Sequence, residues 1–509
     1  MGQLKTKILL FDELVAKIAE LKAAGKVVVQ SHGIFDLIHP GILMHLDDAC
    51  SQGDVLIVTV IKDKDVRRGP GRPIFPEDMR ARNAAALAKV DYVCIVNDAT
   101  PFESVKTLRP NVLAKGQGYR GRHKDIHEKL EAEERGLYFD QISIHETRGF
   151  SFSSSTIVNN FLDIYSEETK QFIKEFNVKY GFNYVADRIN ELNNMKVLLI
   201  GDGIIDEYFY TEPMGRSAKA NLVVNKYLSC EAFAGGAFAI ANHLASFCGK
   251  VHLMSLIGEL DTREEFIRQN LKPNVEVELF TRSETMTVIK KRYLQENNKQ
   301  KLFEINYLHD VYISGDIEER IIENLKKQIL DYDVVLISDF GHGFITENIV
   351  NCIKEAGVRF GVNAQTNGAN AGFNLITKYS DPYFVCLDEA EVRLAMQERF
   401  MDVKDIIPTI TNSISAQNMI VTLGNKGSIG INRDGIINTT PIFSSKVVDT
   451  VGAGDAFFSY TSSCLASGMP MDAVSFVGNA VGALAVQILG NKKAVEKHEL
   501  LEFIHAVLK

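Results

Sequence analysis

The string Asp449-Thr450-Val451-Gly452-Ala453-Gly454-Asp455-Ala456-Phe457 places two glycines and a carboxylate at the start of an apolar helical segment. Glycines two positions apart let backbone N–H groups converge, and the positive end of a helix favours an anion there. Gly452, Ala453 and Gly454 could therefore form an anion hole for a transferring phosphoryl group. Asp455 at its rim could accept the proton of an attacking hydroxyl. A tight turn with Asp455 as a helix cap is the alternative, and it suffices for this string taken alone.

Three further segments accompany this string along the chain. Asp206 follows an apolar run, Gly235-Gly236 precedes a helical segment, and Thr422–Gly427 follows another apolar run. In this order, the segments resemble the ribokinase-like family of sugar kinases over residues 195–509. No G-x-x-x-x-G-K-[ST] loop occurs in the sequence, so the P-loop route to phosphoryl transfer is absent.

The resemblance implies a role for each matching residue. Asp455 would be the catalytic base, and Asp206 with Gly235 and Gly236 would contact sugar hydroxyls, since a carboxylate accepts two hydrogen bonds from a diol. Lys291 and Arg292 are candidates for gripping a substrate phosphate, or else exposed charges on a strand. The residues expected to line the nucleotide site are Thr422, Gly424, Gly427 and Asn479.

The same segment departs from the family pattern at four places. The family's Asn-x-x-Glu, associated with magnesium and phosphate handling, reads Cys386-Leu387-Asp388-Glu389, which keeps Glu389 as the expected metal ligand and loses the Asn. Ala239 replaces the Asn that usually follows Gly-Gly-Ala, and His342 stands where a Lys is common. The amide-rich stretch Asn363–Asn367 is expected to reshape the substrate or product pocket. We still expect a kinase that uses ATP and Mg²⁺, with its sugar specificity open.

A second chemical signal, His32–Gly41 (H-G-I-F-D-L-I-H-P-G), joins an apolar run to a helical segment. In such a turn, a helix N-terminus and imidazoles stabilise charge on the α-phosphate while pyrophosphate leaves. The segment resembles the signature G-x-F-D-x-x-H-x-G-H of the nucleotidylyltransferase superfamily. His39 fills the first histidine position as the expected catalytic residue, whereas the second is Ile42, which cannot donate a hydrogen bond. His32 and His45 are alternatives, but a helix places His45 about one turn beyond Ile42.

Other segments between residues 25 and 160 match the bacterial heptose-1-phosphate adenylyltransferase type of this superfamily. Arg67–Ile74 and Leu108–Gly116 follow its layout, and Ser153–Ile157 resembles its S-S-T-x-I phosphate-binding turn. Losing one charge-stabilising donor costs ~10²–10³ in rate, so Ile42 weakens the transferase without abolishing nucleotide binding. The residues expected to bind this nucleotide, ATP or CTP, are Gly33, Phe35, Asp36, Gly41, Ser154, Ser155 and Thr156.

Apolar runs that alternate with helical segments organise both halves of the chain. Runs such as Val55–Val60 and Lys196–Ile200 predict strands of parallel sheets built from βαβ units. We expect an α/β protein with two doubly wound domains. Residues 1–165 would form a Rossmann-like nucleotidylyltransferase fold, 166–194 a helical connector, and 195–509 a ribokinase-like fold.

The composition excludes several classes of protein. The chain has 509 residues, 46% of them hydrophobic and 24% charged, and a net charge of −9, which argues against a nucleic-acid partner. Seven scattered cysteines without a C-x-x-C pair indicate neither a disulfide framework nor a zinc site. Without a secretory signal or an apolar run of ~18 residues, we expect a cytoplasmic protein with no membrane partner. A homodimer is the commonest assembly of soluble proteins.

Together the two halves resemble the bifunctional enzyme that makes nucleotide-activated heptose, with the usual order of the halves reversed. The resemblance implies ATP-dependent phosphorylation of a sugar or sugar phosphate, and nucleotidyl transfer to a sugar phosphate with release of pyrophosphate. The alternative is a sugar kinase alone, whose N-terminal domain is catalytically impaired and serves regulation or assembly. The sugar, the hydroxyl that is phosphorylated and the choice between ATP and CTP stay open.

Overall fold

The computed structural model describes residues 7–66, 72–98, 100–116, 142–147, 165–366, 368, 370–444 and 447–509. The chain divides into two compact units, which are described separately below. The first comprises Met1–Asn177 with Leu501–Lys509, and the second comprises Val178–Leu500.

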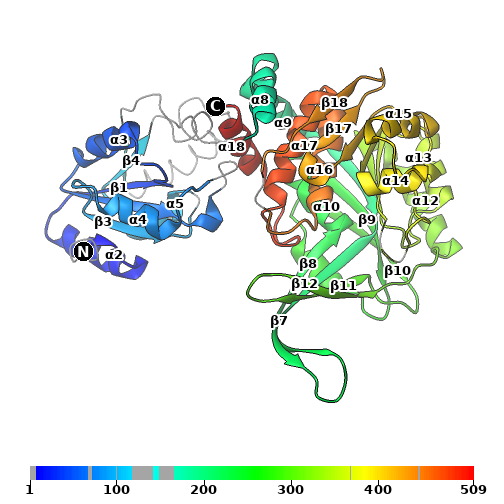
Figure 1. Ribbon diagram of the computed structural model, residues 1–509, viewed down its shortest axis with the longest axis horizontal. Helices are drawn as coiled ribbons and strands as arrows, with labels where there is room; N and C mark the ends of the chain where they lie inside the picture. The colour runs from blue at the N-terminus through cyan, green and yellow to red at the C-terminus, as the bar shows by residue number, and fades with distance from the viewer. Residues whose placement is uncertain are drawn as a thin grey trace. The chain divides into compact units, whose positions relative to one another are not determined.

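The described part of the first unit contains a five-stranded parallel sheet of order β3-β2-β1-β4-β5 (Figure 1). The strands are β1 (Val28–Gly33), β2 (Val55–Ile61), β3 (Tyr92–Val96), β4 (Val112–Gly116) and β5 (Ser143–Thr147). β2 is buried along its whole length, as expected of a strand whose two faces are both covered.

Helices cover both faces of this sheet. Leu46 of α3 packs in one apolar cluster with Val29, while Leu14 of α2 packs in another with Val28. Because adjacent strand residues point to opposite faces, these two clusters are the two layers of a doubly wound fold. The helical segments are α2 (Phe11–Ala23), α3 (Pro40–Cys50), η1 (Asp63–Asp65), α4 (Glu77–Ala85) and α5 (Phe102–Leu108).

The segment between the two sheets is helical. It contains α8 (Glu167–Lys179), α9 (Gly181–Glu191) and the 3₁₀ turn η3 (Leu192–Asn194). The boundary between the two compact units falls inside α8.

The second unit is built on a sheet with nine strands among the described residues, in the order β10-β9-β6-β13-β14-β15-β16-β17-β18. The pairs are parallel from β10 to β16, and the last two are antiparallel. The strands are β6 (Lys196–Gly201), β9 (Lys250–Gly258), β10 (Val275–Arg282), β13 (Val334–Asp339), β14 (Phe360–Ala364), β15 (Phe384–Asp388), β16 (Met419–Thr422), β17 (Ser428–Ile431) and β18 (Ile437–Thr440).

This sheet is also covered on both faces. On one face, α12, α13, α14 and α15 join an apolar cluster with alternate residues of β6 and β13, such as Leu198 and Val335. α10, α16 and α17 contact the same sheet, and α16 contacts both α10 and α17. The helical segments are α10 (Ala237–Ala245), α11 (Glu264–Asn270), α12 (Gly315–Gln328), η4 (Ile329–Asp331), α13 (Glu347–Glu355), η5 (Ile376–Lys378), α14 (Glu389–Met396), α15 (Val403–Ser413), η6 (Gly424–Lys426), α16 (Ala453–Ala466) and α17 (Met471–Ala485). The last helix, α18 (Lys497–Val507), begins in this unit, and its residues from Leu501 onward are assigned to the first.

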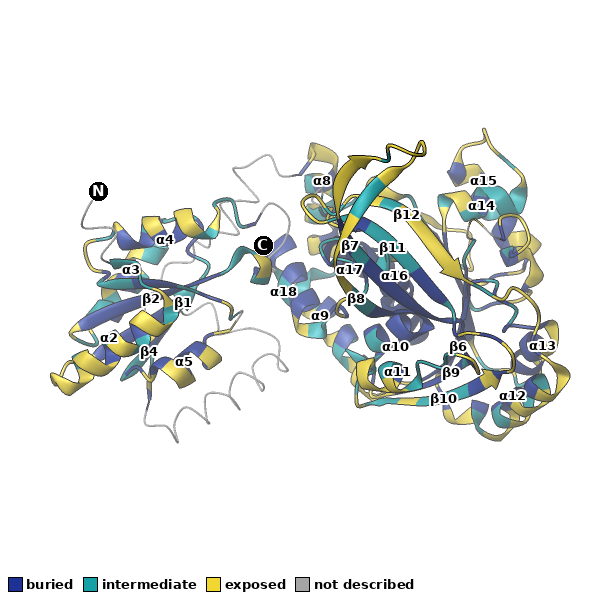
Figure 2. Cartoon of the chain, turned by 90° about the horizontal axis from the view of Figure 1, so that it is seen from below, coloured by how far each residue is buried: buried dark blue, intermediate teal, exposed yellow. Residues whose placement is uncertain are grey.

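A separate four-stranded sheet of order β12-β11-β7-β8 completes the described part of the second unit. Its strands are β7 (Gly203–Arg216), β8 (Val223–Gly236), β11 (Ile289–Gln295) and β12 (Lys301–Tyr307). The far ends of β7 and β8 are exposed, whereas central strands of the nine-stranded sheet such as β6 and β13 are almost fully buried (Figure 2). This sheet was not among those predicted from the sequence.

The structure confirms the predicted α/β class and the two doubly wound sheets. Within the ranges described, no helix combines the length and the apolar character that crossing a membrane requires.

Candidate functional site

A cavity of about 290 Å³ lies in the second unit, where the carboxyl ends of its parallel strands meet the four-stranded sheet. Ligands of open α/β sheets bind at this edge. Predicted site residues that line it are Asp206, Gly236, Arg292, Thr422, Gly452, Gly454 and Asp455. Lining residues that the sequence analysis did not assign to a site are Lys290, Asp388, Glu391 and Asn491.

Asp455 lies in the first turn of α16 and is almost fully buried. Burial raises its pKa to about 6, and a hydrogen bond from Gln365 to its Oδ1, at 2.8 Å, opposes this rise. A carboxylate with a pKa slightly below neutral is ionised at physiological pH and still basic enough to accept a proton. The geometry therefore suits Asp455 to act as a general base.

The turn before Asp455 has the conformation expected of an anion hole. Gly452 caps α16 with a φ of 81°, a left-handed conformation that favours glycine. A Cβ added there would also collide with Oδ1 of Asn491. The first turn of a helix leaves N–H groups without intrahelical partners, so Gly454 and Asp455 offer donors for an anion. The N–H of Ala453 makes a long hydrogen bond to the carbonyl of Thr450, at 3.3 Å.

The acceptor side of the cavity is organised around Asp206. Its carboxylate forms an ion pair with Arg292, which also pairs with Glu304 at 2.7 Å. Asn491 donates to Oδ2 of Asp206 at 3.2 Å. A Cβ on Gly235 would lie 2.2 Å from the same oxygen, so this glycine is what allows the close approach of β8 to the carboxylate.

The two basic residues predicted to grip a phosphate point to opposite faces of β11. Adjacent strand residues alternate, so Arg292 shares the cavity face with Lys290 and not with Lys291. Lys291 instead lies 3.7 Å from Glu207 and 4.6 Å from the centroid of the Tyr307 ring. For Lys291 the alternative, a charged residue on a strand away from the site, fits the structure, and Lys290 is the second cation that lines the cavity.

Lys290 is 8% exposed, and burial lowers its pKa. Among the described residues its Nζ has no hydrogen-bond or ion-pair partner; it lies 5.5 Å from the centroid of the Phe340 ring. Because an unpaired buried ammonium group is costly, this position favours a bound anionic group.

Glu389, the predicted metal ligand, does not line the cavity. Its Oε1 accepts hydrogen bonds from Arg393 at 2.7 and 2.9 Å. Two residues further along, Glu391 lines the cavity beside Asp388, and burial raises its pKa to about 8. The motif is therefore Asp388-x-x-Glu391, with Asp in place of the family's Asn, and placing the family's Glu at 389 was an error of two residues.

Asp388 and Glu391 are two carboxylates of the cavity that could hold a magnesium ion together with a nucleotide. The carboxylate of Glu391 already accepts the backbone N–H groups of Thr366 at 3.1 Å and of Asp388 at 2.8 Å. No cluster of three or more His, Cys, Asp or Glu suited to hold a metal by itself occurs among the described residues. Mg²⁺ is commonly held by one or two carboxylates together with substrate phosphates, and needs no such cluster. Bound here, it would neutralise phosphate charge.

The predicted nucleotide residues are only partly brought together. Thr422 lines the cavity, whereas Gly424, Gly427 and Asn479 do not. Asn479 donates to Ser428 Oγ at 2.6 Å and so ties α17 to β17. In this structure the buried amide of Asn479 therefore has a structural role. This role was not considered from the sequence.

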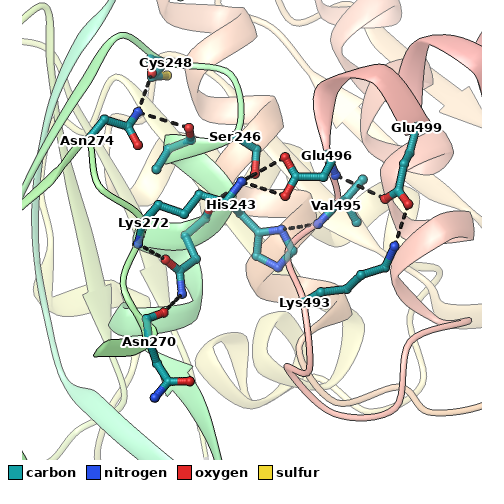
Figure 3. A network of polar contacts seen from close by, with 12 residues as sticks. His243, Ser246, Cys248, Asn270, Lys272, Asn274, Lys493, Val495, Glu496 and Glu499 are labelled. Carbon is teal, nitrogen blue, oxygen red and sulfur yellow. Dashed lines mark hydrogen bonds and ion pairs between the residues drawn. The ribbon is translucent and has the colours of Figure 1, made fainter. Parts of the chain in front are cut away.

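A polar network stabilises the loop after Gly490 (Figure 3). His243 Nδ1 accepts the backbone N–H of Val495 at 3.2 Å, and Glu496 forms an ion pair with Lys272 at 2.6 Å. A second cavity of about 490 Å³ adjoins this network, and Asn491 lines both cavities. The network thus fixes the loop that carries Asn491 to Asp206.

In the first unit, His39 lies at the N-terminus of α3. Its Nδ1 is buried without a partner among the described residues, and burial lowers its pKa. Ile42 packs against the apolar cluster beneath α3. His45 cannot replace the missing histidine freely, because its Nε2 contacts Ser31 Oγ at 2.7 Å and its Nδ1 contacts Thr147 Oγ1 at 2.5 Å.

Other predicted residues of this unit shape the turn. Phe35 is buried with a φ of 53°, a strained conformation for an aromatic residue. The buried carboxylate of Asp36 accepts hydrogen bonds from the backbone N–H groups of Ile74 and Phe75. It therefore stabilises the loop that contains these two residues. Gly33 ends β1, and Gly41 lies in the first turn of α3. Ser154, Ser155, Thr156 and the segment 67–71 lie outside the described residues.

Comparison with known families gives two matches. Residues 195–497 match the pfkB family of carbohydrate kinases, and residues 31–180 match the cytidylyltransferase-like family. Both predicted resemblances, and the Rossmann-like and ribokinase-like folds that they imply, are confirmed. The chain thus carries a carbohydrate kinase domain and a nucleotidyltransferase-like domain.

Among curated proteins, the bifunctional protein HldE of Aliarcobacter butzleri is 40% identical over 125 residues, which is 24% of this chain and 26% of that protein. HldE of Syntrophotalea carbinolica is 34% identical over 167 residues, 32% of each chain. The chain therefore spans only about a quarter to a third of the length of these relatives.

Among solved structures, phosphofructokinase-2 from Escherichia coli superposes with a TM-score of 0.49 and 17% identity, covering 62% of this chain and 99% of that one. Arabidopsis thaliana ribokinase, complexed with ribose and ATP, gives a TM-score of 0.47 and 17% identity, with 61% and 99% covered.

Proposed function

The chain belongs to the pfkB family of carbohydrate kinases, and we propose that its second unit transfers the γ-phosphoryl group of ATP to a hydroxyl of a sugar or sugar phosphate. The observation that carries this proposal is the placement of Asp455, with a pKa of about 6, beside the Gly452–Gly454 turn in one cavity. A base and a set of anion donors at one point are the parts that phosphoryl transfer needs.

In this account Asp206 orients the acceptor by accepting hydrogen bonds from its hydroxyl groups, and Arg292 and Asn491 hold that carboxylate in place. Asp455 takes the proton of the attacking hydroxyl. The N–H groups of the Gly452–Gly454 turn bind the phosphoryl oxygens as charge develops on them. Magnesium at Asp388 and Glu391 supplies charge neutralisation when it is bound.

We further propose that the first unit transfers a nucleotidyl group from ATP or CTP to a sugar phosphate and releases pyrophosphate. The cytidylyltransferase-like match and the relatives named bifunctional support this step. His39, at the start of α3, has a buried Nδ1 without a partner among the described residues, and its imidazole is the group proposed to contact a phosphate. The substrate proposed for the whole chain is a heptose-like sugar on the route to a nucleotide-activated form.

A second candidate function is a sugar kinase whose first unit binds nucleotide without transferring it. The specific observation in its favour is Ile42, which offers no hydrogen bond where a second histidine belongs, while both ring nitrogens of His45 are engaged. Loss of one such donor costs ~10²–10³ in rate. In this case the first unit serves regulation or assembly.

A phosphorus NMR time course of the full chain tests both candidates. The protein is incubated with Mg²⁺, ATP, CTP and a panel of heptose and hexose phosphates, without pyrophosphatase. ADP together with pyrophosphate and a new sugar–nucleotide diphosphate signal is the result expected of the bifunctional enzyme. ADP alone favours the second candidate, and the absence of ADP contradicts the kinase.

A further inference from the structure

Asp449, the first residue of the turn before Asp455, receives four hydrogen bonds. Its Oδ1 accepts the N–H of Val451 at 3.1 Å and the ammonium group of Lys301 at 2.6 Å. Its Oδ2 accepts the hydroxyl of Tyr208 at 2.9 Å and the N–H of Gly490 at 3.0 Å. The carboxylate thus joins the turn to two strands of the four-stranded sheet and to the loop that carries Asn491.

Only one of these donors carries a charge. Asp449 is 6% exposed, so its carboxylate depends on that charge to remain ionised in the interior. Lys301 stands at the start of β12, and its side chain is 36% exposed. The ammonium group that neutralises the buried carboxylate of Asp449 therefore comes from a partly exposed residue of the four-stranded sheet.

Lys301 and Val451 share the same carboxylate oxygen. Removing the ammonium group leaves a buried charge that must take up water or a proton, and either change weakens the hold on Val451. Val451 directly precedes Gly452, whose left-handed φ of 81° sets the direction of the anion donors. Two hydrogen bonds, from Lys301 to Asp449 and from Val451 to the same oxygen, therefore connect Lys301 to the anion hole.

The same strands also hold the acceptor side of the cavity. Lys301 and Arg292 both lie against the ring of Tyr208, at 5.9 and 5.8 Å from its centroid. Arg292 pairs with Asp206, and Tyr208 bonds to Asp449. The four-stranded sheet thus fixes the acceptor carboxylate and the anion-hole turn at the same time.

We propose that Lys301 is a positioning residue for phosphoryl transfer, which acts through Asp449 to hold the Val451–Gly454 turn in the conformation that binds the transferring group. This inference rests on the proposed kinase function. Lys301 touches neither substrate nor the reacting atoms, so its removal lowers turnover and leaves substrate binding largely intact.

The test compares Lys301→Met, which keeps most of the side-chain stem, with Lys301→Arg and the wild-type chain. Lys299→Met is the matched control, because Lys299 lies two residues away and pairs with Glu296 at 2.9 Å. ADP formation is measured with the panel of sugar phosphates, with and without added methylammonium. We expect Lys301→Met to lower kcat at least about tenfold while KM for ATP and acceptor changes less than about twofold.

Lys301→Arg is expected to retain most of kcat. Methylammonium is expected to restore part of kcat in Lys301→Met and to have no such effect on the other chains. A structural role would not produce this amine rescue. If wild type forms ADP and Lys301→Met equals it, or loses activity that neither Arg nor methylammonium restores, the inference is overturned and the kinase function stands. If wild type forms no ADP with any acceptor, the kinase function fails and this inference falls with it.

Discussion

Gln365 donates a hydrogen bond from its Nε2 to Oδ1 of Asp455 across 2.8 Å. The same amide nitrogen lies 2.7 Å from Oδ1 of Asn363, whose own amide donates to the carbonyl of Cys386. A chain of amides at the ends of β14 and β15 therefore fixes the proposed base. Asn363 and Gln365, two residues of the amide-rich stretch that departs from the family pattern, line the cavity.

Replacement of Asp455 by Asn is expected to remove kinase turnover, by roughly 10²–10⁴-fold, because a general base contributes about that much. ATP binding should be retained, since the anion donors are backbone groups. ADP formation and calorimetric titration with ATP measure the two effects. Retained turnover would contradict the role of Asp455, and lost ATP binding would indicate a disturbed site instead.

The same variant should be more stable than the wild-type chain at neutral pH. Burial raises the pKa of Asp455 from 3.8 to about 6. The folded state thus binds this proton more tightly than the unfolded state, and stability falls as pH rises from about 4 to about 6. The Asp455→Asn substitution removes a cost of roughly 3 kcal/mol at pH 7. Thermal unfolding should show a higher midpoint for the variant at pH 7.5, with the difference vanishing near pH 4.

The pH dependence of turnover provides a further prediction. Because Asp455 accepts a proton only when ionised, kcat/KM should rise with pH through about 6. The hydrogen bond from Gln365 lowers this pKa, so Gln365→Leu should move the rise to higher pH by roughly one unit. A pH–rate profile of both chains measures the shift. A profile of Gln365→Leu that stays in place, or moves to lower pH, would show that the bond does not tune the base.

The metal site gives a direct contrast between two glutamates. Glu391→Gln is expected to raise the Mg²⁺ concentration needed for half-maximal ADP formation about tenfold or more, because Glu391 lines the cavity. Glu389→Gln, which loses only the pair with Arg393, should leave that concentration unchanged. Magnesium titrations of both variants provide the measurement. The reverse order of effects would return the metal to Glu389.

The position of this motif shows what the sequence alone could decide. From the sequence, the family's Glu was placed at Glu389 and Glu391 was not considered, although both lie in the first turn of the same helix. In the structure, Glu391 lines the cavity and forms a capping box with Asp388, whereas Glu389 pairs with Arg393. A capping box is readable in sequence, and Asp388-x-x-Glu391 was the signal that could have placed the motif correctly.

Two lysines on one strand provide another contrast. Lys290→Met is expected to raise KM for a phosphorylated acceptor or to lower kcat, by about tenfold, because its ammonium group is the cation of the cavity that has no partner among the described residues. Lys291→Met should change neither value more than about twofold, since Lys291 faces Glu207 and Tyr307. Steady-state kinetics with neutral and phosphorylated acceptors checks this. Equal effects of both substitutions would contradict the assignment of faces.

A strand at Lys291 and Arg292 was considered from the sequence as an alternative, but the four-stranded sheet to which it belongs was not predicted. Charged and aromatic residues lie on both faces of the strands β7, β8, β11 and β12. On one face, the ring of Tyr293 stacks with those of Phe209 and Phe303. Their pattern lacks the continuous apolar run that marks β6 and β13. The strands that are buried on both faces were therefore predicted from their apolar runs. The four-stranded sheet was missed, because its strands have no such run.

In the first unit, His39→Ala is expected to remove pyrophosphate release and to leave ADP formation by the kinase unchanged. Ile42→His should increase pyrophosphate release about tenfold or more, because it restores a donor at the start of α3. A coupled pyrophosphate assay measures both, and Asp455→Asn serves as the cross-control that spares this reaction. Pyrophosphate release that is insensitive to His39→Ala would refute the assignment of His39.

Transfer of radiolabel from [γ-³²P]ATP to an acceptor, followed in wild-type and Asp455→Asn chains side by side, tests the central claim most directly. The account predicts a labelled sugar phosphate with the wild-type chain in the presence of Mg²⁺, and its loss in the variant at undiminished ATP binding. Label that reaches no member of the heptose and hexose panel, or that reaches it equally fast in Asp455→Asn, would contradict the account.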